Sequence, residues 1–121
     1  MLQHEHENQF NHNDAFLDWL LIEKSQFYDW IITVSFYAAL HKMHSCLHTK
    51  GVPCHRIRNH DSLRKQITNH FPENISTFYD MLHFECRKIR YDQTDLNTIN
   101  KTYVQDFIDA WKMIIKPFAT S

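Results

Sequence analysis

The side chains in this sequence that are best suited to chemistry are imidazole and guanidinium groups. The chain holds ten histidines and has a formal net charge of only −1, so binding of an anion must depend on a local cluster rather than on a general positive field. Arginine offers phosphate a planar, bidentate donor, and histidine offers a donor that is easily tuned. A cluster of the two residue types therefore indicates recognition of RNA or of a nucleotide phosphate.

Eight residues from predicted helices and one loop make up the predicted phosphate- or RNA-binding set: His41, His55, Arg56, Arg58, His60, Arg87, Arg90 and Tyr91. We expect the helical members to converge at one end of the protein, with the loop members beside them. Tyr91 is placed to stack on a base. A second interpretation stays open, in which His41 satisfies a buried hydrogen bond in the core. The two helical arginines then pair with the acidic residues Asp80, Glu85 or Asp92.

The same residue types can cleave RNA without a metal. One group must position or deprotonate the 2′-hydroxyl, and a cation must neutralise the developing phosphorane charge. The sequence leaves the catalytic residues unknown, with four candidates: His60, Arg87, Arg64 and His70. Arg64 and His70 have a suitable spacing, but a helix turns by about 100° per residue, so these side chains point apart unless the helix ends between them. In the alternative interpretation, Arg64 is exposed to solvent and His70 lies at the C-terminal end of the helix.

A histidine stripe also raises the question of a metal site. His41, His44 and His48 share one helix face, and Cys54 and His55 follow on the predicted loop. Zinc needs four ligands in a tetrahedral array, usually as closely spaced pairs from two elements. The stripe coincides with the face expected to pack in the core, where His44 is a packed or interface residue. We therefore predict no metal and no cofactor.

Five helical segments are expected to position these groups. The central segment runs from about residue 30 to Lys50 and stops at Gly51, the only glycine. Its apolar residues at steps of three and four predict one buried face: Trp30, Val34, Tyr37, Leu40, His44 and Leu47. The other expected helices cover 15–24, 59–71, 74–91 and 98–116. Residues 1–11 are expected to be flexible, 52–59 to form a loop and 92–98 a connection.

Each of the other helices also carries an apolar stripe. The residues expected to face inward are Phe16, Leu17, Leu20 and Leu21, then Leu63, Ile67 and Phe71, then Ile75, Phe78, Tyr79, Leu82, Cys86 and Ile89, and finally Tyr103, Phe107, Ala110, Trp111, Ile114 and Phe118. One glycine and three prolines leave few turn signals, which favours helices over many short strands. The predicted fold is all-α, an up-and-down antiparallel bundle of four main helices plus one shorter helix, in a single domain over residues 1–121.

Composition narrows the setting. The apolar stretch over residues 30–40 is too short to span a bilayer, so we expect no membrane association. Three cysteines without a C-x-x-C pair, after a polar N-terminal segment, predict reduced thiols and a cytoplasmic location. A single glycine excludes a phosphate-cradling loop of the P-loop kind.

Three short motifs resemble those of the HEPN domain family (higher eukaryotes and prokaryotes nucleotide-binding), of the small stand-alone bacterial type. The residues FYAALH at 36–41 are similar to the family signature YYA-x-[FL]-H on its second helix. His60 resembles the S-H at the start of its third helix. The run of Arg87, Arg90, Tyr91 and Asp92 resembles the R-x-x-[AR]-[DY] ending of its penultimate helix. The resemblance covers residues 25–118, and the Asp29-Trp30 pair is similar to a D-W found in a bacterial subgroup.

Two departures bear on what the resemblance implies. Asn59 stands where the family often has Ser or Thr, and the R-x(4–6)-H motif of the ribonuclease members is missing from the final helical region. The family forms bundles of four to five helices that commonly dimerise, in prokaryotic toxin–antitoxin, defence or nucleotidyltransferase-associated systems. The resemblance therefore implies a HEPN-like homodimer that binds RNA, a nucleotide phosphate or a partner protein such as a nucleotidyltransferase.

Two other functions stay open. The first is a metal-independent HEPN ribonuclease with Arg/His residues at a dimer interface, although the missing motif favours a protein that is not an enzyme. The second is a structural interaction domain, in which exposed aromatic residues such as Trp19 or Trp111 contact a partner. The arginines would then be replaceable, while the aromatic residues would not.

Overall fold

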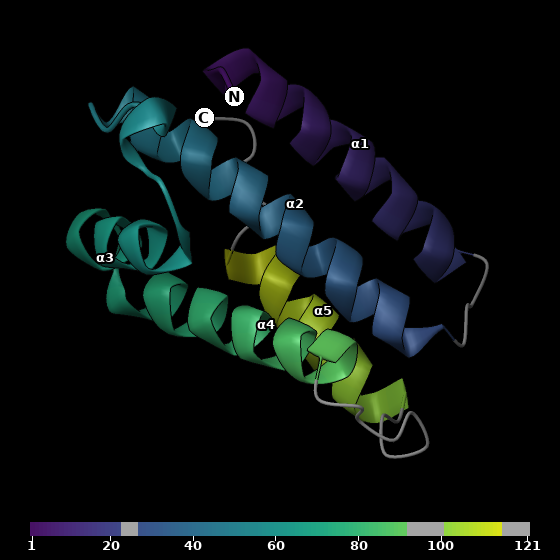
Figure 1. Ribbon diagram of the computed structural model, residues 1–121. Helices are drawn as coiled ribbons and strands as arrows, with labels where there is room; N and C mark the ends of the chain where they lie inside the picture. The colour runs from purple at the N-terminus through teal and green to yellow at the C-terminus, as the bar shows by residue number, and fades with distance from the viewer. Residues whose placement is uncertain (23–26, 92–100, 115–121) are drawn as a thin grey trace.

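The computed structural model describes residues 1–22, 27–91 and 101–114, except for the side chains of residues 22, 91, 101–103 and 113–114 (Figure 1). The elements in chain order are α1 (Gln3–Ile22), α2 (Tyr28–Thr49), the 3₁₀ turn η1 (Cys54–Arg56), α3 (His60–His70), α4 (Glu73–Tyr91) and α5 (Lys101–Ile114). The described residues contain no strand, and none of their helices is long and apolar enough to cross a membrane. The predicted all-α bundle is confirmed, with α3 as the shorter helix.

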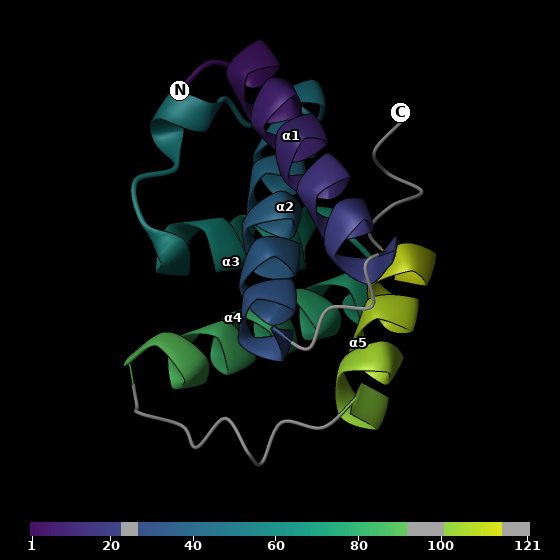
Figure 2. The same ribbon diagram turned by 90° about the vertical axis from the view of Figure 1, so that its right-hand side faces the viewer.

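Helix α2 is the centre of the bundle. It packs against all four other helices and against η1, with α1 lying along one side of it and α4 and α5 on the other (Figures 1 and 2). Buried residues therefore occur on almost every side of α2. The predicted stripe is wrong at Trp30 and Tyr37, which are 50% and 37% exposed. Because α2 is buried on nearly all sides, the spacing of its apolar residues does not identify one buried face.

Helix α1 begins at Gln3, so the prediction that residues 1–11 are flexible is wrong. His6 and Phe10 are buried, and the Gln3 amide donates hydrogen bonds to the Ser45 carbonyl oxygen at 3.1 Å and to Thr49 Oγ1 at 2.8 Å. Contacts with α2 thus stabilise a segment whose own sequence is largely polar. Among the residues predicted to face inward, Leu17 and Leu20 are buried and Leu21 packs at the edge of the core, whereas Phe16 is exposed.

The turn between α2 and α3 follows local sequence signals. Gly51 has φ of +93°, a value that residues with a Cβ rarely adopt, and it follows the C-cap residue Lys50 of α2. Asn59 caps α3, since its side-chain oxygen accepts a hydrogen bond from the Ser62 backbone N–H at 2.8 Å. The helix ends at His70 because Pro72 disfavours helical geometry at Phe71. These boundaries agree with the predicted ones.

The stripes of the last three helices form most of the remaining core. The buried members are Leu63, Ile67, Phe71, Ile75, Phe78, Tyr79, Leu82, Cys86, Phe107 and Trp111. Ile89 and Ala110 pack at its edge. Since Trp111 is fully buried, the expectation that it contacts a partner is wrong, whereas Trp19 is 57% exposed. The predicted connection 92–98 and the inward positions Tyr103, Ile114 and Phe118 lie outside the side chains described.

Candidate functional site

A groove of about 850 Å³ lies between α2, α3 and α4. Its lining consists of Phe36 and Tyr37 of α2, Asn59, His60, Asp61 and Arg64 at the start of α3, and Asp80, His83, Phe84, Cys86 and Arg87 of α4. We call it the α2–α3–α4 groove. Its size falls within the range of about 300–1,000 Å³ that is typical of small-molecule sites. Two predicted residues that are far apart in sequence, His60 and Arg87, meet there.

A row of stacked rings forms one wall of the groove. The His83 ring lies parallel to the buried Phe36 ring, with centroids 5.1 Å apart, and stacks on the His60 ring at 4.7 Å. Because Asn59 caps α3, His60 is the first residue of that helix, and it lines the groove. The two imidazoles thus lie stacked beside each other at the start of α3.

The environment of His83 favours its neutral form. Burial lowers the pKa of the His83 imidazole, and the neighbouring His60, Arg87 and Arg64 side chains lower it further. A neutral imidazole has one N–H donor and one acceptor nitrogen, so it can donate one hydrogen bond to a ligand and accept another.

The two arginines of the groove differ in their partners. Arg64 Nε donates to Asp80 Oδ1 at 2.8 Å, and this bond and charge raise the pKa of Arg64. Arg87 is exposed and makes no ion pair with any residue in the described parts of the chain. Of its predicted acidic partners, Asp80 pairs with Arg64, Glu85 lies 3.9 Å from Lys88, and Asp92 lies outside the described residues. Of the two groove arginines, Arg87 is therefore the more available to a ligand.

The rest of the predicted set does not form the single cluster that was expected. Arg58 lines a smaller hollow of about 390 Å³ that shares His60 with the groove. Arg90 lies in a separate hollow with Asp29 and Trp30, because it is almost one helical turn beyond Arg87 on α4. The prediction that Arg90 converges with His60 and Arg87 is therefore wrong.

Three other candidates lie outside the groove. His55 and Arg56 are exposed on η1, and His70 is exposed at the end of α3, so none of them lines the groove. This placement agrees with the expectation that the Arg64 and His70 side chains point apart. Tyr91 ends α4, but its side chain is not among those described, so its predicted stacking stays a prediction.

His41 belongs to a different cluster on the side of α2 that faces α1. Its Nδ1 lies 2.8 Å from His6 Nδ1, a hydrogen bond between two imidazoles, and the His6 ring in turn stacks on His44 at 4.4 Å. The interpretation of His41 as a residue with a satisfied core hydrogen bond therefore fits better than a place in the phosphate site. Its partner was not predicted because residues 1–11 carry no clear apolar stripe.

His83 is the groove residue that the sequence interpretation missed. A signal for it exists, because Asp80, His83 and Arg87 lie at i, i+3 and i+7 and so share one face of α4. Once Arg87 is a candidate, the same face identifies His83 as its neighbour. The stacking on Phe36 could not be predicted, since it depends on how α4 packs against α2.

Comparisons of the chain with protein-family models, with curated proteins and with solved structures give no match.

Proposed function

We propose that this chain is a HEPN-like helical module whose α2–α3–α4 groove binds the phosphate of single-stranded RNA or of a nucleotide. The observation that carries the proposal is the position of Arg87, which makes no ion pair with the described residues and lies beside the stacked His60 and His83. A guanidinium can donate two parallel hydrogen bonds to a phosphate, and an adjacent imidazole can add another.

The aromatic rim of the groove supports a base beside that phosphate. Tyr37 and Phe84 both line the groove and are 37% and 65% exposed, and stacking of a base on such a ring is worth about 1–3 kcal/mol. The formal charges of Arg64 and Arg87 are balanced by Asp61 and Asp80. This balance suits one phosphate with its base better than a long duplex, whose backbone needs a row of unopposed cations.

Binding of a short fluorescent single-stranded RNA at low salt tests the proposal. Arg87→Gln removes a charged hydrogen-bond donor worth about 1.5–3 kcal/mol, so we expect affinity to fall about 10- to 100-fold. Arg90→Gln is the matched control, because it removes the same charge from the same helix outside the groove. A parallel titration with a mononucleotide separates recognition of one phosphate from that of a strand.

Two outcomes would reject a phosphate site in this groove. The first is an absence of binding of either probe by the wild-type protein at low salt. The second is an equal loss of affinity in the Arg87 and Arg90 variants, because diffuse attraction to the whole surface predicts equality.

The pairing of His60 with His83 favours metal-independent RNA cleavage as a second candidate function. A neutral imidazole can accept the proton of the 2′-hydroxyl while the second imidazole, in its protonated form, gives a proton to the leaving oxygen, and Arg87 can neutralise the phosphorane. RNA cleavage in EDTA should then be lost in His60→Ala, His83→Ala and Arg87→Ala but kept in His70→Ala, whose side chain is exposed at the far end of α3. Binding without cleavage in the wild-type protein would leave the binding module as the function.

The motif resemblance also leads us to propose a cytoplasmic homodimer within a prokaryotic defence or toxin–antitoxin system, with a nucleotidyltransferase as one class of partner. Exposed aromatic residues near the groove support an interface there. Identification of the nucleic acid or polypeptide that co-purifies with the protein from its native host tests this setting.

A further inference from the structure

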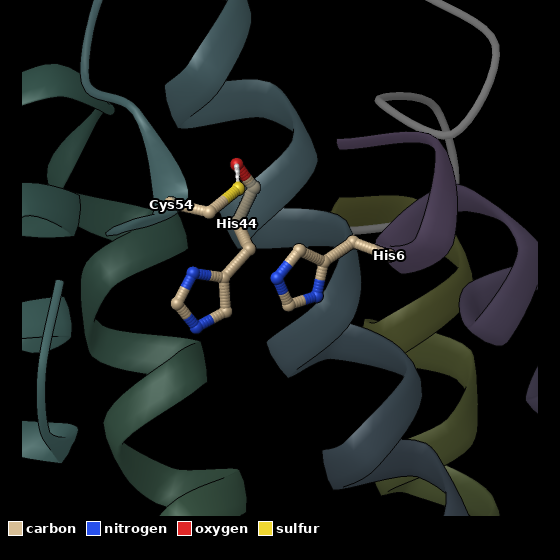
Figure 3. A group of neighbouring side chains, drawn as sticks. All are labelled: His6, His44 and Cys54. Carbon is tan, nitrogen blue, oxygen red and sulfur yellow. Dashed lines mark hydrogen bonds between the residues drawn. The ribbon is translucent and has the colours of Figure 1, made fainter. Parts of the chain in front are cut away.

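A second cluster of donor groups lies where α1, the last turns of α2 and η1 meet. His6, His44 and Cys54 come from these three elements, and each has a possible ligand atom within 4.8 Å of those of the other two (Figure 3). The cluster is separate from the α2–α3–α4 groove, whose lining includes none of the three residues.

Each of the three side chains has a donor atom without a strong competing partner. The Nδ1 atom of His6 is engaged by His41 at 2.8 Å, and its other ring nitrogen is directed toward His44 (Figure 3). His44 Nδ1 is buried and has no hydrogen-bond partner among the described residues. Cys54 Sγ makes only long contacts, at 3.8 Å to the His44 carbonyl oxygen and 4.0 Å to His48 Nδ1. Since buried polar atoms in folded proteins are nearly always paired, the orphaned His44 nitrogen points to a ligand.

The protonation states suit a cation. Burial lowers the pKa of both His6 and His44 to about 4, and the neighbouring imidazoles lower it further. Both rings are therefore neutral at neutral pH, which is the form that coordinates a metal. Burial raises the pKa of the Cys54 thiol, so a bound metal has to displace its proton.

We propose that His6, His44 and Cys54 form a Zn²⁺ site that fastens α1 to α2 and η1. One thiolate and two neutral imidazoles match the ligand preference of zinc, and on binding the Cys54 thiol releases its proton to solvent. Zinc–ligand bonds of about 2.0–2.3 Å in a tetrahedron put the ligand atoms roughly 3.5 Å apart. The donors thus need to approach by about 1 Å, and the His44 ring, which is stacked on His6, has to rotate about its side-chain bonds so that a nitrogen faces the ion. His48 Nδ1 or a water completes the fourth position.

His41 acts as a positioning residue for this site. A zinc-bound histidine normally donates its second ring N–H to an acceptor, which fixes its tautomer and orientation. The 2.8 Å contact between His6 Nδ1 and His41 Nδ1 supplies that acceptor and leaves the other His6 nitrogen to the metal. Loss of such a partner typically weakens binding by about 10- to 100-fold.

The experiment is a titration of the chelator-treated, reduced full-length protein with Zn²⁺ and with Co²⁺. We expect one ion per chain, a thiolate-to-cobalt charge-transfer band in the near ultraviolet, and a rise in the thermal unfolding midpoint with Zn²⁺. Cys54→Ser should lose the charge-transfer band and weaken binding by more than about tenfold, and His41→Phe should weaken binding while keeping the band. Two control variants, His12→Gln on the exposed side of α1 and His55→Gln next to Cys54, should bind as the wild-type protein does.

Two results would overturn the site. One is a wild-type protein that binds neither ion at micromolar concentrations. The other is binding that survives in Cys54→Ser but is lost in His4→Gln, because that pattern places the ion on the exposed N-terminal histidines. Circular dichroism of each apo variant distinguishes loss of the ligand from loss of the fold, and His44→Gln serves as a second ligand variant if Cys54→Ser unfolds.

Discussion

Lys42 is a charged residue in the core whose side chain is only 1% exposed. Its ammonium group lies 2.8 Å from Glu7 Oε1 and 5.3 Å from the centroid of the Phe10 ring, and Ser45 donates a further hydrogen bond to the same carboxylate. Burial disfavours the ionised Glu7, but the bonds from Lys42 and Ser45 outweigh it and keep the pKa of the carboxyl below its ordinary value. The buried charge of Lys42 on α2 is therefore stabilised by Glu7 of α1.

Removal of one partner from this pair should lower the free energy of unfolding more than removal of both. Glu7→Ala leaves the Lys42 charge buried and uncompensated, so we expect the free energy of unfolding to fall by about 3 kcal/mol. The double variant Glu7→Ala/Lys42→Met removes that charge and should recover most of the loss. Urea denaturation of the two variants measures the difference. A double variant less stable than Glu7→Ala would contradict the premise that the unpaired Lys42 charge causes the loss.

The pH dependence of stability should report on His83. Because the pKa of His83 is lowered in the folded protein, the unfolded chain takes up its proton first as the pH falls below the ordinary value of about 6.5. This group therefore stabilises the fold above that pH, and its contribution is lost as the pH falls toward the folded pKa. Urea midpoints measured from pH 7.5 to 5 should fall less steeply in His83→Phe than in wild type. An unchanged slope would contradict the lowered pKa.

At the scale of elements, local signals predicted α2, α3 and α4 well and α1 poorly. Asn59, Gly51 and Pro72 act within one helical turn, so their effect on helix ends is visible in the sequence. The first half of α1 is stabilised instead by partners on α2 that are more than 30 residues away, as the Glu7–Lys42 pair shows. No local pattern marks such contacts. For the same reason, the motifs identified His60 and Arg87 but did not identify the contact between His6 and His41.

The effect of the α3 cap on stability can be measured separately from its effect on ligand binding. Asn59→Ala removes the acceptor for the Ser62 N–H, so we expect a loss of about 1 kcal/mol in the free energy of unfolding. Asn59→Asp keeps an acceptor and suits the positive end of the helix dipole, so its stability should match that of wild type. Since Asn59 lines the groove, the added negative charge should nevertheless weaken RNA binding. Chemical denaturation and RNA titration of the same two variants measure both effects.

At the scale of the whole molecule, α2 contributes to two regions of different chemistry. His41 and His44 of its later turns form a cluster with His6 of α1, while Phe36 and Tyr37 line the α2–α3–α4 groove. Beside the groove lies an aromatic ridge that we define by Trp30, Tyr37 and Phe84. Trp30 and Tyr37 are seven residues apart on α2 and so share a side of that helix, while Tyr37 and Phe84 line the same groove.

The Trp30 end of the aromatic ridge should carry the proposed homodimer, because Tyr37 and Phe84 form the rim proposed for the base. Trp30 is 50% exposed, and burial of such a side chain is worth about 1.5–3 kcal/mol. Trp30→Ser should therefore weaken dimerisation by about tenfold or more, as measured by analytical ultracentrifugation over a range of concentrations. Trp19→Ser is the matched control, because Trp19 is 57% exposed but lies on α1 and lines neither the groove nor the hollow that contains Trp30. If the wild-type protein is monomeric throughout, or if the Trp19 variant dissociates as readily as the Trp30 variant, the ridge is not the interface.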